Sequence, residues 1–145
     1  MKLTTRTRYG TRALADLAER YDDGLQTTAE IAQRQAISAK YLEGLLTRLC
    51  ERGLVVSVRG ARGGYRLARP AAQITVKDIY QALEATTVFV PCVGEPQSCA
   101  HSADCMTHVV WREMYEASMS VLARYSLDQL VRRECSRHEW PGGIM

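Results

Sequence analysis

The chain has 145 residues, of which 46% are hydrophobic and 24% charged. This length suits one domain, or one small domain with an appendage, and the composition excludes a disordered chain and a collagen-like repeat. A TIM barrel or a two-half dinucleotide fold would need more residues. The net charge of +3 is unevenly distributed: residues 1–70 hold 13 Lys and Arg against 7 Asp and Glu, whereas residues 71–145 hold 6 against 9. This basic first half makes a polyanionic partner worth testing.

Three helices are predicted in the first half of the chain. Apolar residues recur at helical spacing over residues 6–21. Thr27 and Glu30 form a capping box that begins a short second helix, which Ala36 and Ile37 break. Ser38 then caps a third helix. Its apolar face consists of Leu42, Leu45, Leu46 and Leu49.

A β-hairpin is predicted after the third helix. Residues 54–58 form a short segment rich in β-branched side chains, and residues 59–64 are rich in glycine and arginine. Residues 65–68 alternate between apolar and other side chains, and Pro70 ends this second segment. The order helix–helix–helix–hairpin over residues 1–70 is typical of a winged helix-turn-helix domain. The fold class expected is therefore mainly α, with a β-hairpin wing and a recognition helix.

The polar side of this unit suits DNA. A recognition helix needs an apolar stripe that seats it and polar or basic side chains that reach the bases. Hydroxyls at helix starts can hold phosphates, and arginines at the wing tip suit a minor groove. Gly44 also leaves room for the backbone to approach a phosphate or the groove floor. For any single residue a solvated surface is the better interpretation, but the set on this frame indicates DNA binding. The candidate contacts are Thr28, Ser38, Lys40, Tyr41, Glu43, Thr47, Arg48, Arg59 and Arg62.

The second half is predicted to combine an irregular segment with a long helix. Thr75 and Asp78 cap a fourth helix that extends to about Glu84. Residues 86–106 show no helical period and contain three of the five cysteines. A long helix follows over about residues 107–125, and its apolar stripe is wider than one small core requires. We therefore expect this helix to pack on its own domain and on a partner.

The residues expected at that partner contact lie along the long helix. They are Val110, Trp111, Met114, Val121 and Leu122. Ser126 and Gln129 form a further capping box that begins a last short helix. The expected organisation is a DNA-binding domain over residues 1–70, a cysteine segment with dimerisation helices over residues 71–134, and a flexible tail over residues 135–145.

The cysteines indicate a metal or redox site. The chain shows no signal peptide and no apolar run of about 18–20 residues, so we expect it in the cytoplasm, where thiols stay reduced. The spacing Cys92-x6-Cys99-x5-Cys105-x2-His108 can hold zinc or an iron–sulfur cluster. Structural zinc generally uses tighter cysteine pairs, so these wide gaps favour a cluster. An imidazole ligand makes such a site easier to lose or oxidise, which suits a sensor.

His101 is the rival to His108, although a loop histidine at the surface is the commoner role. A set of unrelated loop thiols is the alternative to a common site. Cys50, one residue beyond the leucine face, suits a small buried hydrophobic side chain, and Cys135 receives no role.

Several motifs support a resemblance to a known family. They are Met1-Lys2-Leu3-Thr4 with Arg8-Tyr9, Ile37-Ser38-x-x-Tyr41-Leu42-Glu43, Val58-Arg59-Gly60-x-x-Gly63-Gly64-Tyr65, and Cys105-Met106-Thr107-His108-x-x-Trp111-Arg112. Over residues 1–134 the chain resembles IscR-type iron–sulfur transcriptional regulators, a winged-helix family that also holds nitric-oxide-sensing and cysteine-metabolism repressors. The resemblance implies a homodimer joined by the long helix, binding to palindromic promoter DNA, and a [2Fe-2S] cluster. The implied ligands are Cys92, Cys99, Cys105 and His108. The first gap is one residue longer than in IscR, which keeps His101 open as a substitute.

The leading hypothesis is a homodimeric transcriptional regulator whose cluster state controls DNA affinity or site choice in response to redox, iron or oxygen. An alternative is a DNA-binding repressor with a zinc or thiol sensor. A third hypothesis is an electron-transfer or cluster-carrier protein that uses the winged helix to bind protein. The chain has no nucleophile–base pairing and no phosphate-binding loop, so we do not expect an enzyme.

Overall fold

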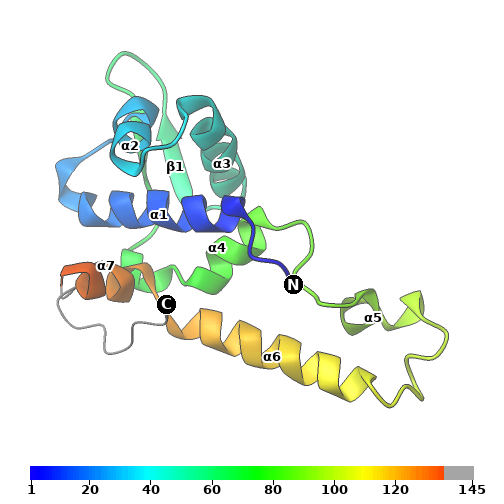
Figure 1. Ribbon diagram of the computed structural model, residues 1–145. Helices are drawn as coiled ribbons and strands as arrows, with labels where there is room; N and C mark the ends of the chain where they lie inside the picture. Colours follow the sequence, from blue (N-terminus) through cyan, green and yellow to red (C-terminus); the bar gives the residue numbers. More distant parts are fainter. Residues whose placement is uncertain (136–145) are drawn as a thin grey trace.

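The computed structural model describes residues 1–135, which form a mainly helical fold with one two-stranded antiparallel sheet (Figure 1). The expected fold class is therefore confirmed. The predicted tail lies outside the described residues from residue 136 onward. The helices are α1 (Thr5–Glu19), α2 (Thr28–Gln35), α3 (Ala39–Glu51), α4 (Val76–Leu83), α5 (Pro91–Gly94), α6 (His108–Arg124) and α7 (Leu127–Cys135). The strands are β1 (Val55–Val58) and β2 (Gly64–Leu67), and three 3₁₀ turns span Tyr21–Asp23, Ala71–Gln73 and Pro96–Ser98.

Side-chain caps set the starts of the first three helices. Thr4 caps α1 by accepting a hydrogen bond from the Arg6 backbone N–H at 3.1 Å, so this helix begins one residue earlier than predicted. The capping box of Thr27 and Glu30 is present at α2. The Ser38 hydroxyl oxygen accepts from the Tyr41 backbone N–H at 3.1 Å and begins α3. The three predicted N-terminal helices are thus confirmed.

The ends of α1 and α2 depend on unusual turns. The prediction extended the first helix to Tyr21, but α1 ends at Glu19 and Tyr21 lies in a 3₁₀ turn, where it is 53% exposed. The expected continuation of the helical spacing to Tyr21 was therefore wrong, because α1 ends two residues earlier. Ala36 ends α2 in the left-handed region at φ 53°, which costs an L-residue roughly 1 kcal/mol. This sharp turn directs the chain from α2 into α3.

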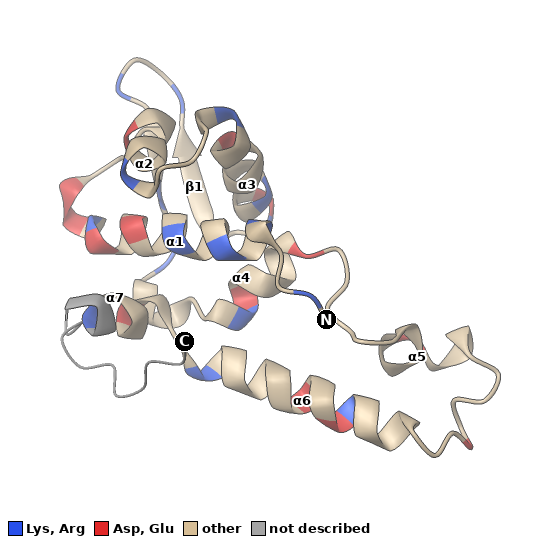
Figure 2. Ribbon diagram, in the orientation of Figure 1, with Lys and Arg blue, Asp and Glu red and all other residues tan. Residues whose placement is uncertain are grey.

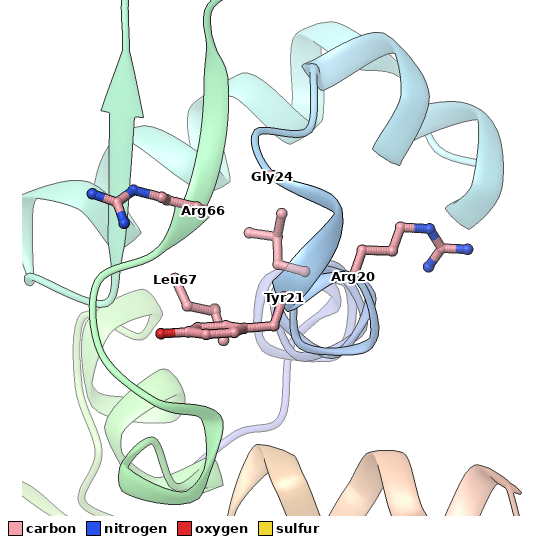
Figure 3. A pocket seen from close by; sticks show the side chains of 6 residues that line it. Arg20, Tyr21, Gly24, Arg66 and Leu67 are labelled. Carbon is pink, nitrogen blue, oxygen red and sulfur yellow. The ribbon is translucent and has the colours of Figure 1, made fainter.

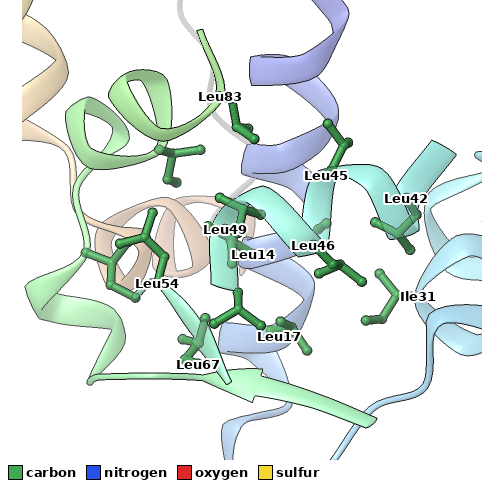
Figure 4. Close-up of a cluster of buried hydrophobic side chains, with 14 of the residues drawn as sticks. Leu14, Leu17, Ile31, Leu42, Leu45, Leu46, Leu49, Leu54, Leu67 and Leu83 are labelled. Atoms are coloured by element: carbon green, nitrogen blue, oxygen red, sulfur yellow. The ribbon is translucent and has the colours of Figure 1, made fainter. Parts of the chain in front are cut away.

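The hydrophobic core fills the space between α1, α2, α3, the hairpin and α4 (Figure 4). The leucine face of α3 is fully buried there, as its spacing predicted. The core continues past residue 70, since Ile74, Ile79, Leu83 and Leu127 belong to the same cluster. It consists of Ala13, Leu14, Leu17, Ile31, Ala32, Leu42, Leu45, Leu46, Leu49, Leu54, Val55, Leu67, Ile74, Ile79, Leu83 and Leu127. One hydrophobic core thus includes residues on both sides of residue 70. The expected division there into a DNA-binding part and a sensing part stays a prediction about function.

The hairpin forms the predicted wing. β1 and β2 pair antiparallel from Val55 opposite Leu67 to Val58 opposite Gly64, which leaves residues 59–63 as the exposed tip. Gly60 adopts φ 117°, a conformation that side chains other than glycine rarely accept. The glycines of this segment thus allow the tight turn that carries the two tip arginines.

The C-terminal helices pack around α4 and α1. α7 packs on α1, and its start is tied to the start of α4, because the Val76 N–H donates to the Tyr125 carbonyl and the Leu127 N–H to the Ile74 carbonyl, both at 2.9 Å. α6 lies along α4, and Figure 1 shows it running along one side of the molecule with α5 beside its N-terminal end. The long predicted helix is confirmed. Residues 86–106 were expected to lack helix, but they contain the short α5, which Pro91 begins at a position that proline favours.

Gly10 marks a close crossing of α1 and α4, and it gives a first testable prediction. A Cβ atom at this buried position would overlap Leu83 Cδ1, which has no free space because Leu83 is fully buried. Gly10→Ala should therefore lower the free energy of unfolding by about 1–3 kcal/mol, although alanine favours helix. The matched control is Gly44→Ala, since a Cβ there would point into open space, and it should stabilise by about 0.5–1 kcal/mol. Urea unfolding at one fixed protein concentration measures both, and a stabilised Gly10→Ala variant would contradict the crossing.

Candidate functional site

The recognition helix α3 presents a polar face opposite its buried leucines. Lys40, Glu43, Thr47 and Arg48 are all exposed there, together with Gly44. Figure 2 shows basic residues on α3, on α1 and on the loop of the wing. Both candidate DNA-reading elements, α3 and the wing tip, are therefore exposed and basic, and their contact with DNA stays a prediction.

The remaining candidates on α2 and α3 differ in accessibility. Thr28 is the first residue of α2 and is half-buried, whereas Ser38 is exposed at the start of α3. The Thr47 hydroxyl donates to the Glu43 carbonyl at 2.9 Å. Tyr41 packs its ring edge-on against Tyr9, with 6.0 Å between ring centroids, and its buried hydroxyl has no hydrogen-bond partner among the described residues. Its geometry favours packing, and a contact between Tyr41 and DNA stays a prediction.

The wing carries two kinds of arginine. Arg59 and Arg62 are exposed at the tip, where the prediction put them. Arg66 of β2 instead lines a shallow, open hollow that is also lined by Tyr21 and by Arg20, the residue before the first 3₁₀ turn (Figure 3). None of the predicted site residues lines this hollow. Replacing Arg66 can therefore serve as the control when the tip arginines are replaced.

The predicted cluster ligands lie along the segment that joins α4 to α6. Cys92 lies in α5, Cys99 follows the last 3₁₀ turn, and Cys105 precedes α6; all three thiols are free and half-buried. A hydrogen bond between the Cys105 thiol and the Thr107 hydroxyl at 3.3 Å, helped by backbone N–H groups, lowers the pKa of Cys105 and so favours its thiolate. His108 begins α6, and its Nδ1 atom is buried without a hydrogen-bond partner among the described residues.

These four side chains are not gathered around one point. Among residues 1–132, whose side chains the structure describes, no three side chains of His, Cys, Asp or Glu are close enough to ligate one metal ion. The donor set nevertheless fits a soft metal group, because free thiols and a buried, unpartnered imidazole nitrogen are the atoms that such a group needs. His101 is exposed, as a surface histidine would be. Cys50 is half-buried, and its burial raises the pKa of the thiol, which agrees with the expected packing role.

A buried carboxylate that the sequence did not single out links α1 to the start of the cysteine segment. Glu84 ends α4 and is only 4% exposed. It accepts a hydrogen bond from the Thr4 hydroxyl at 2.6 Å and a second one from the Thr7 hydroxyl, and it pairs with Arg6 at 3.5 Å. Burial alone would raise the pKa of Glu84. The hydrogen bonds and the Arg6 charge outweigh burial, so the pKa is lowered. No local pattern could have predicted contacts across about 80 residues.

The long helix α6 leaves an apolar stripe uncovered. Val110, Met114 and Val121 are 47%, 42% and 43% exposed, and Met119 is its one buried residue among those described. Trp111 and Leu122 are half-buried, because their own chain covers part of them. The expected partner contact therefore divides into an exposed stripe and two flanking residues.

The Rrf2 family, described as iron-dependent transcriptional regulators, matches residues 3–133. The chain belongs to this family. Protein rrf2 from Nitratidesulfovibrio vulgaris is 43% identical over 132 residues, which cover 91% of this chain and 88% of that protein. The HTH-type transcriptional regulator IscR from Xenorhabdus nematophila is 39% identical over 134 residues, which cover 92% of this chain and 81% of that protein.

Solved structures give the same result. The chain is similar to T. potens IscR, with a TM-score of 0.77, 33% identity, and coverage of 98% of this chain and 94% of that one. It is also similar to CymR, the global cysteine regulator of B. subtilis, with a TM-score of 0.76, 31% identity, and coverage of 92% and 98%. An IscR-type winged-helix regulator of transcription is thereby confirmed, and these relatives are regulators rather than enzymes. Among the described residues, no helix has both the length and the apolar character needed to cross a membrane.

Proposed function

We propose that this Rrf2 protein is a homodimeric iron–sulfur regulator that binds palindromic promoter DNA, with its cluster state controlling DNA affinity or site choice. The observation that carries the proposal is the buried, unpartnered Nδ1 atom of His108, which lies three residues after the free Cys105 at the start of the long helix. A metal group bound by both the His108 nitrogen and the Cys105 sulfur would explain why a polar nitrogen is buried there.

DNA binding is assigned to two elements of each protomer. The exposed face of α3 enters a major groove, where Lys40, Glu43 and Arg48 can reach base edges or phosphates. The wing tip directs Arg59 and Arg62 toward the adjacent minor groove. Two copies joined through α6 present two such units, which suits a site with two-fold symmetry.

The sensing role is assigned to the segment between α4 and α6. Cys92, Cys99, Cys105 and His108 would hold a [2Fe-2S] group, which supplies a one-electron redox change and can be lost on oxidation. This segment joins α4, which packs on α1, to α6, which would hold the partner. A change in the arrangement of the segment therefore alters how α6 lies against α4. In a dimer this changes the distance between the two α3 helices.

A thiol sensor without a cluster is the second candidate. The chain is 33% identical to S. aureus CymR solved in an oxidised form, with a TM-score of 0.68 and coverage of 90% of this chain and 96% of that one. The lowered pKa of Cys105 suits direct oxidation of that thiol. Metal analysis separates the two candidates.

The deciding experiment combines metal analysis with DNA binding. The protein is purified without oxygen, and iron, acid-labile sulfide, zinc and visible absorption are measured. The holo, oxidised and apo forms are then compared by gel shift on a duplex selected by the protein from a random-sequence pool. Visible absorption, iron with sulfide, and different binding by the three forms would support the proposal. A colourless protein with one zinc per chain would overturn the cluster and favour the alternative repressor with a zinc or thiol sensor.

Single replacements test the ligand set. Cys92→Ala, Cys99→Ala and Cys105→Ala should each lose the visible absorption and most of the iron, because a four-ligand site does not retain the group with three. Cys50→Ala is the matched control and should keep both, since Cys50 packs against the core. His108→Ala compared with His101→Ala identifies the fourth ligand. Iron retained in Cys92→Ala would remove that residue from the set.

The wing tip gives a separate prediction for DNA binding. Arg59→Ala should weaken binding to the selected duplex by about 1–3 kcal/mol, the loss expected for an arginine that reads a base or a narrow groove. Arg66→Ala removes the same side chain from the same hairpin, but from the hollow beside Tyr21, and should change binding by less than about 0.5 kcal/mol. Fluorescence anisotropy titrations measure both. Unchanged binding by Arg59→Ala would exclude this residue from the interface.

A further inference from the structure

A part-buried ion pair joins α1 to α2, since its carboxylate is buried and its guanidinium, 27% exposed, reaches the surface. Asp16 of α1 is 2% exposed, and both of its carboxylate oxygens accept hydrogen bonds from Arg34 in the last turn of α2, from Nε at 2.8 Å and from Nη2 at 2.7 Å. Such two-pronged pairs are the most directional that side chains form. The hydrogen bonds to Asp16 also raise the pKa of Arg34. The pair therefore fixes the end of α2 against α1.

The same guanidinium reaches a third element. Arg34 Nη2 also donates to the side-chain oxygen of Gln26 at 2.9 Å, and Gln26 is 8% exposed. Only an arginine can make this set, because its planar fork directs several N–H groups at two acceptors at once. A lysine would keep the charge but lose part of the set. Gln26 is thus held from the side of α2.

The backbone of Gln26 is in turn paired with the wing. Its N–H donates to the Tyr65 carbonyl at 3.0 Å, and its carbonyl accepts from the Tyr65 N–H at 2.8 Å, so Gln26 extends the sheet on the free edge of β2. Gly64 permits this approach, since a Cβ there would lie 2.8 Å from the Gln26 carbonyl oxygen. Gly64 and Tyr65 directly follow the exposed tip. Gln26 is therefore an anchor close to the tip arginines.

The far end of the hairpin is held in a different way. Leu54, Val55 and Leu67 are buried in the core, at the end of the strands away from the tip. The core therefore fixes the base of the wing, and the Gln26 pairing restrains the part next to the tip. Gly60 and Gly63 leave the tip itself with little stiffness of its own. The direction of the tip then depends on Gln26, and Gln26 depends on Arg34.

We infer that Arg34 is a positioning residue for DNA recognition, which sets where the wing tip lies relative to the recognition helix without contacting DNA itself. The inference rests on the proposed contact between the wing and DNA. Asp16 holds Arg34, Arg34 holds Gln26, and Gln26 holds β2, so one chain of polar contacts connects α1, α2 and the wing. A loss at Arg34 affects discrimination between sequences through the tip arginines.

A double-mutant cycle tests this inference. The wild type, Arg34→Lys, the Arg59→Ala/Arg62→Ala protein and the combined protein are titrated against the selected duplex and against a scrambled duplex. Arg34→Lys should weaken binding to the selected duplex by about tenfold, the loss of roughly one specific contact, and binding to the scrambled duplex by less than about twofold. In the protein without tip arginines the same replacement should cost less than about twofold, because its effect passes through them.

Controls separate positioning from folding. Arg20 also pairs with Asp16, at 3.3 Å, but not with Gln26. Arg20→Lys should therefore leave the discrimination between the two duplexes unchanged. Gln26→Met removes the side-chain acceptor and keeps the backbone pairing, so it should reproduce the effect of Arg34→Lys even where the latter reduces stability. Equal losses in both backgrounds, or equal losses on both duplexes, would overturn the inference. A tip variant that binds as well as the wild type would instead overturn the proposed wing contact.

Discussion

Replacing Met114 with glutamate is expected to dissociate the protein into monomers and to remove its tight binding to palindromic DNA. Val110, Met114 and Val121 lie on one side of α6 and are more than two-fifths exposed, which is unusual for three large apolar side chains in a row on one helix. In the proposed dimer this stripe is covered by its copy. A charge buried there without a partner costs several kcal/mol, so the dimer dissociation constant should rise by at least about 100-fold.

The measurement is sedimentation equilibrium, followed by gel shift on the selected duplex. The matched control is Ala123→Glu, because Ala123 is exposed on the same helix nine residues further on, about half a turn away from Met114. It adds the same charge outside the stripe and should leave the dimer intact. A Met114→Glu protein that remains dimeric would show that another surface joins the two copies, and a monomeric wild type would remove the proposed dimer altogether.

Elements that depend on neighbours in sequence were predictable. The capping boxes at Thr27 and Thr75 formed as expected, and so did the exchange between Ser126 and Gln129, in which each backbone N–H bonds to the other side chain. The reason is that caps and apolar stripes act over three or four residues, a range that a single sequence displays directly. The fold class and the wing were confirmed on the same grounds.

Contacts between distant polar groups were not predictable. Arg34 was not singled out, although it carries the connection between α1, α2 and the wing, and Glu84 was not recognised as buried. Each meets partners that no periodic pattern marks, since their positions follow from how the helices pack. The helical spacing expected to continue to Tyr21 failed for a related reason. The end of α1 lies earlier than expected, so Tyr21 points outward.

The candidate metal site shows the same division. Spacing identified the thiols and the imidazole as a group, and the structure supports the chemistry of the set through the buried Nδ1 atom of His108. Spacing does not determine which side chains meet, because residues 86–106 have no helical or strand period that fixes their directions. The identity of the ligands therefore remains a prediction that only replacement can test.

Replacing Glu84 with glutamine is expected to lower the free energy of unfolding at pH 7 by about 1–3 kcal/mol, because a carboxylate accepts from buried hydroxyls more strongly than an amide oxygen does. The Thr4 hydroxyl has a double role here, since it donates to Glu84 while its oxygen accepts from Arg6 and caps α1. Weakening this one contact therefore loosens both the helix start and its link to α4.

The pH dependence gives the sharper test. The pKa of Glu84 in the folded protein lies below its ordinary value near 4.5, so the carboxylate stabilises the fold above that value and loses its contribution as the pH falls through the folded pKa. The difference in unfolding free energy between wild type and Glu84→Gln should thus be full at pH 7 and should shrink below about pH 4. Glu51→Gln, at an exposed position on α3, should change stability by less than about 0.5 kcal/mol. Urea unfolding across this pH range measures all three proteins. A difference that stays constant with pH would mean that the glutamine acts through its shape and not through the missing charge.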